Sequence, residues 1–322
     1  MRALRDEAIV AEDRGAHSEA RQLAMIAAAR NLHDTPSQLM RLNIDVSRRD
    51  LAGVARDIDV VLRAEPSRYV ALTPLLGAVV AAGGGAEVAS HLVRRPPWRE
   101  LFLVRLAQTA RDPGIVFALL KRLSLGPAKP TPDELGAYFD RRLAQHDYSV
   151  AYLDWLQLLP PSALARVGNI YDGDFSGAPG PPPFNWRLSS GPGGSADILS
   201  GSGGRGLLEV AYDGVSTAPL ATEMLVLPPG AYRLTGRSAV TQSGSGSLGW
   251  TLTCASSESP LARTTIVAPA DDSWIGFAAA FTIPDQGCQA QWLRLTPHPG
   301  DRSDDISGRY TGLRIERVVE TS

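Results

Sequence analysis

The sequence predicts two domains of different class, an α-helical solenoid over residues 1–166 and an antiparallel β-sandwich over residues 167–322. Three observations lead to this division. The first part is rich in Ala, Leu and Arg and has apolar residues at helical spacing. It also repeats at about 34 residues, the length of a two-helix unit. The second part is rich in Gly, Pro and Ser, and it contains about ten short alternating runs separated by turn residues, which is typical of an antiparallel sandwich.

The repeat in the first part becomes visible when residues 14–20 are aligned with residues 48–54. In that register Ala24 corresponds to Ile58, so apolar residues recur where the helices of neighbouring units pack. Residues 131–134 (TPDE) form a capping box with proline at the first helical position, which predicts that a helix begins there. The first part is therefore expected to be helical throughout.

A period of 34 residues, with small residues where helices cross and a proline at the end of the unit, resembles tetratricopeptide repeats. The aromatic and glycine residues that usually mark the first helix of each repeat are absent here. The resemblance implies stacked helical hairpins whose concave face binds a protein partner.

Five strings in the second part resemble the strands of galactose-binding-like jelly rolls, a class that includes many carbohydrate-binding modules. They are residues 169–175 (NIYDGDF), 181–188 (PPPFNWRL), 227–237 (LPPGAYRLTGR), 274–284 (WIGFAAAFTIP) and 308–315 (GRYTGLRI). The resemblance covers residues 169–319 and implies a jelly-roll sandwich that binds a glycan. A helical repeat joined to such a module also resembles envelope polysaccharide-associated proteins of sphingomonad-type bacteria.

The charge distribution argues against nucleic acid as a partner. Residues 1–166 carry 22 basic against 19 acidic residues, and residues 167–322 carry 10 against 15. Neither part has the dense basic stripe that phosphate neutralisation needs. The first residues are charged and show no secretory signal, and the longest stretch of low charge, residues 69–86, contains Pro74 and is too short to span a bilayer. We therefore expect no membrane span.

The sequence contains no recognisable catalytic motif. Its histidines are scattered, and no pair has the spacing of metal ligands. Jelly rolls of this class often hold a structural calcium with an aspartate of the last strand, where this chain has Thr311 and Gly312. Asp172 and Asp174 could donate oxygen ligands, but two carboxylates do not make a calcium site. We therefore expect no enzymatic activity, no metal and no cofactor.

Sugars are held by flat aromatic faces together with side chains that form hydrogen bonds. Side chains of these types recur on predicted strands of the second part, where alternation separates the two faces of each strand. The candidate ligand-binding residues are Arg237, Trp250, Gln291, Trp292 and Arg294. The alternative is that the tryptophans, among them Trp186, Trp250 and Trp274, belong to the core.

The two cysteines, Cys254 and Cys288, lie at the ends of predicted strands. Pairing or adjacency of those strands would bring the two sulfurs together as a disulfide, and the alternative is a pair of buried free thiols. A disulfide indicates an oxidising compartment such as the periplasm, whereas free thiols would agree with the cytoplasm.

These observations predict a non-enzymatic scaffold, with a protein partner on the helical part and a glycan on the strand part, and with a role in exopolysaccharide or envelope assembly. Two alternatives remain open. The jelly roll could be a protein-docking domain without a sugar site, or the chain could be an accessory subunit of a carbohydrate-active enzyme on another chain. An exposed aromatic side chain flanked by arginine would favour glycan binding over docking.

Overall fold

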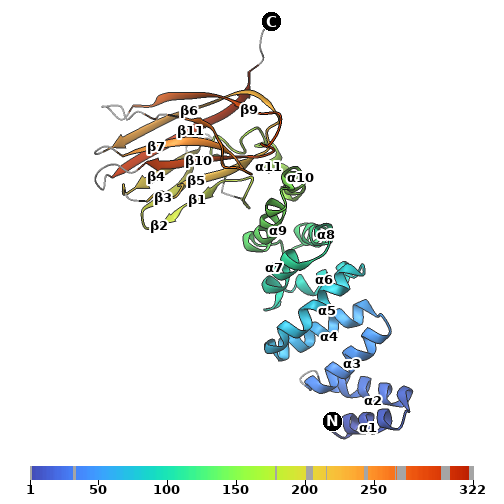
Figure 1. The fold of residues 1–322 in the computed structure, drawn as a ribbon. Helices are drawn as coiled ribbons and strands as arrows, with labels where there is room; N and C mark the ends of the chain where they lie inside the picture. The colour runs from blue at the N-terminus through green and yellow to red at the C-terminus, as the bar shows by residue number, and fades with distance from the viewer. Residues whose placement is uncertain are drawn as a thin grey trace. The chain divides into compact units, whose positions relative to one another are not determined.

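A computed structural model describes residues 2–31, 34–177, 180–200, 206–214, 216–242, 246–264, 266, 273–298 and 305–318 (Figure 1). Its internal contacts divide the chain into two compact units, Met1–Arg141 and Arg142–Ser322. Within the described residues, no helix combines the length and the apolar character needed to cross a membrane.

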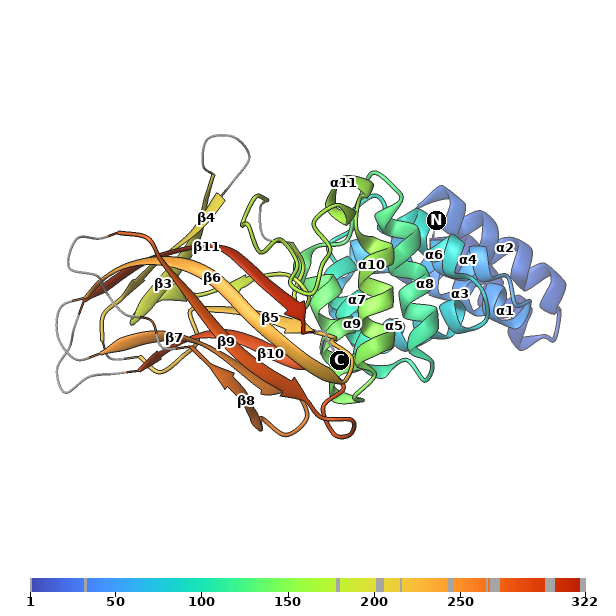
Figure 2. The same ribbon diagram turned by 90° about the horizontal axis from the view of Figure 1, so that it is seen from above.

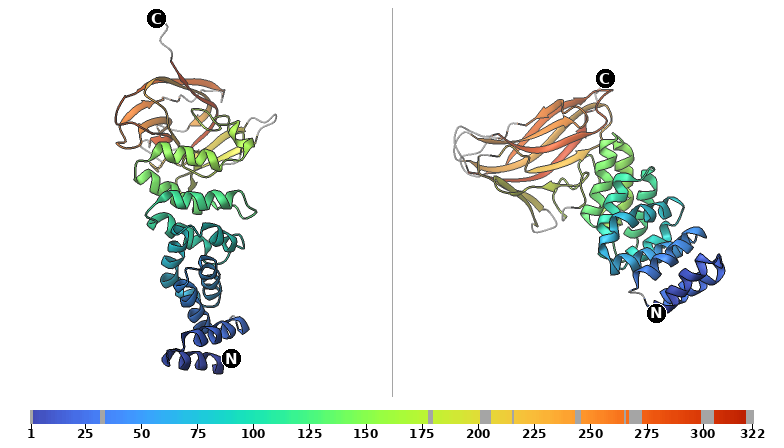
Figure 3. Two further views of the ribbon diagram at one scale, coloured as in Figure 1. Left: turned by 90° about the vertical axis from the view of Figure 1, so that its right-hand side faces the viewer. Right: turned by 60° about the horizontal axis from the view of Figure 1, so that its bottom comes forward.

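The first unit is helical. Its helices are α1 (Arg2–Asp13), α2 (His17–Arg30), α3 (Thr35–Ser47), α4 (Leu51–Ala64), α5 (Tyr69–Ala81), α6 (Gly85–Leu92), α7 (Arg99–Thr109), α8 (Pro113–Ser124) and most of α9 (Pro132–Ala144), with a short 3₁₀ turn at Pro66–Arg68. Each helix from α1 to α5 contacts the next helix along the chain, α7 contacts α8, and α6 contacts both α4 and α8 (Figure 3). Ala24 and Ile58, which the repeat aligns, are both buried. The tetratricopeptide-like geometry and the solenoid stay predictions.

The capping box before α9 is confirmed. The hydroxyl of Thr131 accepts a hydrogen bond from the Glu134 amide at 3.2 Å, and the Glu134 carboxylate accepts one from the Thr131 amide at 2.9 Å. The same carboxylate binds the guanidinium of Arg99, with both N to O distances at 2.7 Å and both side chains buried. This pair joins α7 to α9 and is a link that helical periodicity alone does not predict.

The second unit begins with α10 (Tyr148–Leu158) and the short α11 (Pro161–Leu164). Its strands are β1 (Arg187–Leu188), β2 (Ser190–Gly191), β3 (Gly194–Ser200), β4 (Gly206–Tyr212), β5 (Ala221–Leu225), β6 (Gly230–Gln242), β7 (Ser247–Cys254), β8 (Pro260–Arg263), β9 (Ile275–Ile283), β10 (Gln291–His298) and β11 (Ile306–Arg317). The expected change from helices to strands therefore occurs between Leu164 and Arg187.

The strands form two antiparallel sheets, as expected for a sandwich (Figure 2). The five-stranded sheet has the order β1-β5-β10-β7-β8, and the six-stranded sheet has the order β2-β3-β4-β11-β6-β9. One core cluster contains buried side chains from both sheets, including Leu293 of β10, Trp250 of β7 and Tyr310 of β11. The inward faces of the two sheets are thus mostly apolar, with Glu223 and Gln291 as buried polar exceptions, which leaves the opposite faces for function.

The helix α10 belongs to the strand unit because its aromatic side chains pack against the segment that leads into β1. The Trp155 indole lies 5.1 Å from the Tyr171 ring and 5.8 Å from the Phe184 ring, measured between ring centres. Its N–H donates a hydrogen bond to the carbonyl of Pro181 at 3.2 Å. The boundary at residue 166 marks the change of secondary structure, and its role as the limit of independent folding stays a prediction.

A fragment of residues 167–322 is expected to melt at a lower temperature than a fragment of residues 142–322, because loss of α10 exposes Tyr171 and Phe184. Each kcal/mol lost lowers the melting temperature of a domain of this size by about 2–4 °C, and we expect a difference of several degrees. Thermal unfolding of both fragments, followed by circular dichroism, measures it. Equal melting temperatures would instead support residue 166 as the domain boundary.

Candidate functional site

The candidate site lies on the side of the five-stranded sheet that points away from the core, which we call the outer face. Its centre is β10, where Leu293 and Leu295 are buried in the core. Because side chains alternate along a strand, Trp292, Arg294, Thr296 and His298 point outward; each is partly exposed. The outer face also carries residues of β5 and β7, which pair with β10, and of β1 and β8, which pair with β5 and β7.

Trp292 lies on the central strand of the sheet, as the second residue of β10. Its neighbour across the strand pair is Thr253 on β7, and on the other side it is Met224 on β5. Further along the same face, the Thr251 hydroxyl is 2.9 Å from that of Thr296. The indole is therefore bordered by an apolar side chain and by the Thr253 hydroxyl, and further hydroxyl groups follow along the same face.

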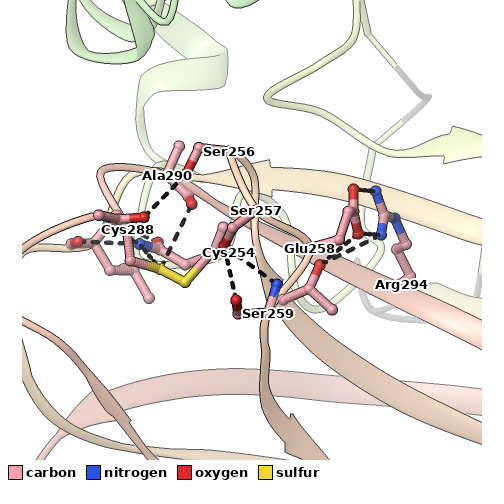
Figure 4. Close-up of a disulfide and its surroundings, with 12 residues drawn as sticks. Cys254, Ser256, Ser257, Glu258, Ser259, Cys288, Ala290 and Arg294 are labelled. Carbon is pink, nitrogen blue, oxygen red and sulfur yellow. Dashed lines mark hydrogen bonds and ion pairs between the residues drawn. A yellow bond between two sulfur atoms is a disulfide. The ribbon is translucent and has the colours of Figure 1, made fainter.

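Arg294 positions the indole rather than offering a free charge. Its guanidinium carbon lies 5.2 Å from the centre of the Trp292 ring, within the range of a cation–π contact. The guanidinium also donates two hydrogen bonds to the carboxylate of Glu258, one of them at 2.9 Å (Figure 4). The hydrogen bond from Arg294 holds the pKa of Glu258 below its usual range. Arg294 is therefore held between an aromatic ring and an anion.

The turn that carries Glu258 is fixed by backbone hydrogen bonds and by the disulfide. Cys254 and Cys288 are bonded, with their Cα atoms 5.1 Å apart, which confirms the predicted pair (Figure 4). The Cys254 carbonyl accepts a hydrogen bond from the Glu258 amide at 2.9 Å, and the Cys254 amide donates one to the Ser259 carbonyl. The turn between β7 and β8 thus holds Glu258 above the outer face.

His298 adds a titratable side chain to the outer face. Partial burial and the nearby positive charge of Arg263 lower the pKa of the imidazole. Both effects disfavour the charged form. At neutral pH the ring is therefore uncharged and can both donate and accept a hydrogen bond.

Two of the predicted site residues are not available to a ligand. Trp250 is fully buried, and its ring centre lies 5.6 Å from that of Trp186 and 5.7 Å from that of Tyr310. The prediction that Trp250 faces a ligand is therefore wrong, and the core alternative holds for this residue. It shares the inward side of β7 with Leu252.

Gln291 is also fully buried, so its prediction as a ligand-binding residue is corrected as well. Its side-chain oxygen accepts a hydrogen bond from the Leu227 amide at 3.0 Å. Its side-chain nitrogen donates to the carbonyl of Cys288 at 2.8 Å. The side chain joins two loops and has a structural role.

Arg237 is exposed but lies on β6, in the six-stranded sheet. Its guanidinium carbon is 5.8 Å from the ring centre of Trp274, which is only partly buried. The structure thus brings together Trp292 and Arg294 of the five candidates and places Arg237 on the other sheet.

The two aspartates considered as calcium ligands have other partners. The Asp172 carboxylate accepts hydrogen bonds from the amides of Ser176 and Gly177 at 2.9 and 2.8 Å. The Asp174 carboxylate accepts a hydrogen bond from Arg314 at 2.6 Å. Within the described ranges, no group of three or more His, Cys, Asp or Glu side chains is placed to hold a metal ion.

No protein-family model and no curated protein matches the sequence. Solved structures with which the chain can be superposed include a putative sugar binding protein from Bacteroides thetaiotaomicron. The two sequences are 9% identical, the superposition covers 45% of this chain and 92% of that chain, and the TM-score is 0.30. A second is the xylan-binding domain CBM22-1 from Paenibacillus barcinonensis, with 12% identity, 46% and 93% coverage and a TM-score of 0.31.

A third is a carbohydrate binding module from Cellvibrio mixtus in complex with cellotriose. The two sequences are 16% identical, the superposition covers 41% of this chain and 92% of that chain, and the TM-score is 0.26. All three are sugar-binding proteins or modules by description.

Proposed function

We propose that the chain is a non-enzymatic binding protein whose strand unit binds a glycan on the outer face of the five-stranded sheet. The observation that carries this proposal is Trp292, a partly exposed indole on the central strand, held by Arg294 and bordered by hydroxyl groups. An aromatic ring of this kind offers an apolar surface to a sugar ring, while its neighbours offer hydrogen bonds to the sugar hydroxyls.

The polar groups around Trp292 suit the hydroxyl groups of a sugar ring. The Thr253 hydroxyl donates to Glu258 at 3.1 Å and the Thr296 hydroxyl pairs with that of Thr251, and each oxygen keeps a lone pair that can accept from a sugar hydroxyl. His298 is neutral at neutral pH because its pKa is lowered. Arg294 contributes by holding the indole in one orientation, which reduces the entropy lost when a ligand binds. The face can therefore combine stacking with several directional hydrogen bonds.

The outer face also supports a binding role more than a catalytic one. Hydrolysis of a glycosidic bond ordinarily uses two carboxylates that flank the bond. Within the described part of the outer face, Glu258 is the one carboxylate, and it is paired with Arg294. Activity was not expected from the sequence, and the proposal keeps that expectation.

Replacing Trp292 with alanine is expected to weaken glycan binding about tenfold or more, because the stacking surface is lost. A glycan array with the full chain first identifies a bound glycan, and isothermal titration then compares the variants. Trp274→Ala is the matched control, since Trp274 is a partly buried tryptophan that contacts an arginine on the other sheet.

Three results would contradict the proposal. They are unchanged affinity in Trp292→Ala, loss of affinity only in Trp274→Ala, and no glycan bound on the array. The last result would favour the alternative in which the strand unit docks a protein.

The remaining features of the proposed role rest on separate observations. The disulfide between Cys254 and Cys288 supports an oxidising compartment such as the periplasm or the envelope. In the helical unit, a groove of about 820 Å³ between α5 and α7 is lined by Gly77, Phe102 and Leu106, among others. This groove agrees with the predicted protein partner. Binding of a partner and a role in exopolysaccharide assembly stay predictions.

A further inference from the structure

Arginine and threonine alternate in one row that crosses all five strands of the five-stranded sheet. The register aligns Arg187 of β1 with Thr222 of β5, Thr222 with Arg294 of β10, Arg294 with Thr251 of β7, and Thr251 with Arg263 of β8. Arg294 and Thr251 point away from the core, so their aligned neighbours share the outer face. Because strands are about 4.8 Å apart, arginines recur about every 9.6 Å across the sheet.

The three arginines of this row differ in their partners. Arg294 is paired with Glu258, as described above. Arg187 and Arg263 are exposed, and among the described residues no carboxylate lies within ion-pair distance of either. The two ends of the row therefore carry positive charges that have no neutralising partner in the described part of the chain.

The six-stranded sheet contains both kinds of neighbour, since Arg237 and Arg314 are aligned with threonines while two other arginines are aligned with glutamates. There Arg309 of β11 is aligned with Glu209 of β4, and Arg233 of β6 is aligned with Glu316 of β11. These arginines have an acidic residue directly across the strand pair. In the Arg187 to Arg263 row the aligned neighbours are threonines, and the guanidinium donors of Arg187 and Arg263 face no carboxylate among the described residues.

We propose that the outer face binds a carboxylated polysaccharide, such as a chain rich in uronic acids, that lies across the strands along the row from Arg187 to Arg263. This inference rests on the proposed glycan-binding function and adds the chemical class of the glycan. Carboxylates of the ligand meet Arg187 and Arg263, because the planar guanidinium binds carboxylates through two parallel hydrogen bonds. A sugar ring of the same polysaccharide stacks on Trp292, which lies two residues before Arg294 on the same face of β10.

Glu258 has a defined place in this inference. Its side chain is 56% exposed and occupies the guanidinium of Arg294, the central arginine of the row. A ligand carboxylate at this point competes with Glu258 for the same donors. Glu258→Gln therefore frees Arg294 and is expected to raise the affinity for a carboxylated chain.

The test uses the full chain and two forms of one polymer, polygalacturonate and its methyl ester, which share a backbone and differ in charge. Isothermal titration at low salt is expected to give about tenfold tighter binding to polygalacturonate, and the difference should shrink at about 1 M salt because exposed charges are screened. The double variant Arg187→Gln/Arg263→Gln is expected to lose this preference while it keeps the weaker binding of the ester.

The matched control is Arg233→Gln/Arg309→Gln, which removes the same number of charges from the six-stranded sheet and should keep the preference. Trp292→Ala should weaken binding of both polymers. Dextran sulfate and dextran serve as a further pair, because a surface that merely attracts anions would bind the sulfated polymer at least as tightly as polygalacturonate.

Different failures overturn different statements. Equal affinity for polygalacturonate and its ester, preference for dextran sulfate, or a preference that survives in Arg187→Gln/Arg263→Gln would overturn the carboxylated ligand and leave glycan binding intact. Binding of no polymer here and no glycan on the array would overturn both.

Discussion

Replacing Trp250 with alanine is expected to lower the free energy of unfolding of the strand unit by about 3–5 kcal/mol. The indole is fully buried and contacts the rings of Trp186 and Tyr310. These three rings come from the segment before β1, from β7 and from β11, so the truncation leaves a cavity where both sheets meet. Hydrogen exchange of the β7 and β10 amides in the full chain measures the loss, because these amides report the strand unit separately from the helices.

Trp292→Ala is the matched control for this experiment, since it removes the same side chain from the outer face. Its free energy of unfolding is expected to change by no more than about 1 kcal/mol. Glycan affinity should respond in the opposite way, with a large loss in Trp292→Ala. If Trp250→Ala destabilised the strand unit no more than Trp292→Ala does, the assignment of Trp250 to the core would be wrong.

The sequence already contained the distinction between these two tryptophans. On β7, Trp250 shares its side of the strand with Leu252 and Cys254, an apolar set that predicts burial. On β10, Trp292 shares its side with Arg294, which predicts exposure. The alternation of side chains within each strand was therefore sufficient to predict that Trp250 is buried and that Trp292 is exposed. Trp250 was wrongly placed among the ligand-binding residues because tryptophan is a residue type that binds sugars.

Gln291 could not be assigned in this way. Its place on the inward side of β10 is visible from alternation, but a buried amide is stable only when its hydrogen bonds are made. The partners are the backbone of Leu227, 64 residues away, and of Cys288. Such partners depend on how two loops meet in space, and a strand pattern carries no information about that.

The composition of the chain predicted that the first part is helical and that the second part consists of strands. It did not predict how side chains pack where the helices give way to the strands. Strand positions follow from alternation and turn residues, as β6 and β7 show. The contact of Trp155 with Tyr171 and Phe184 joins a helix to the strand unit. Helical periodicity shows which side of a helix is apolar, but it does not show which segment packs against that side. The same holds for the row of arginines, because the register between strands is a tertiary property.

Glu223→Gln is expected to make the strand unit more stable at neutral and alkaline pH. Glu223 is fully buried, which raises its pKa well above the usual range, and the charge of Asp172 acts in the same direction. The Tyr171 amide donates a hydrogen bond to one carboxyl oxygen at 2.7 Å, which opposes the shift. The other oxygen has no hydrogen-bond partner among the described residues.

The direction of the pH dependence follows from the raised pKa. An unfolded chain releases the proton of a glutamate near pH 4.3, whereas the folded unit keeps it to a higher pH. Between these two values the folded state binds one proton more than the unfolded state, so stability falls as pH rises, by up to about 1.4 kcal/mol per pH unit. The contribution is fully present below the unfolded pKa and is lost as the pH rises through the folded one.

Urea unfolding of the 142–322 fragment between pH 4 and pH 8 measures this slope. Glutamine keeps the shape of the side chain and the acceptor for the Tyr171 amide but does not titrate, so the Glu223→Gln profile should lack the fall seen in the parent. Glu209→Gln is the matched control, because Glu209 is exposed on the six-stranded sheet, and its profile should stay close to that of the parent. Parallel profiles for the parent and Glu223→Gln would mean that the folded unit holds Glu223 ionised, and the pKa of Glu223 would then not be raised.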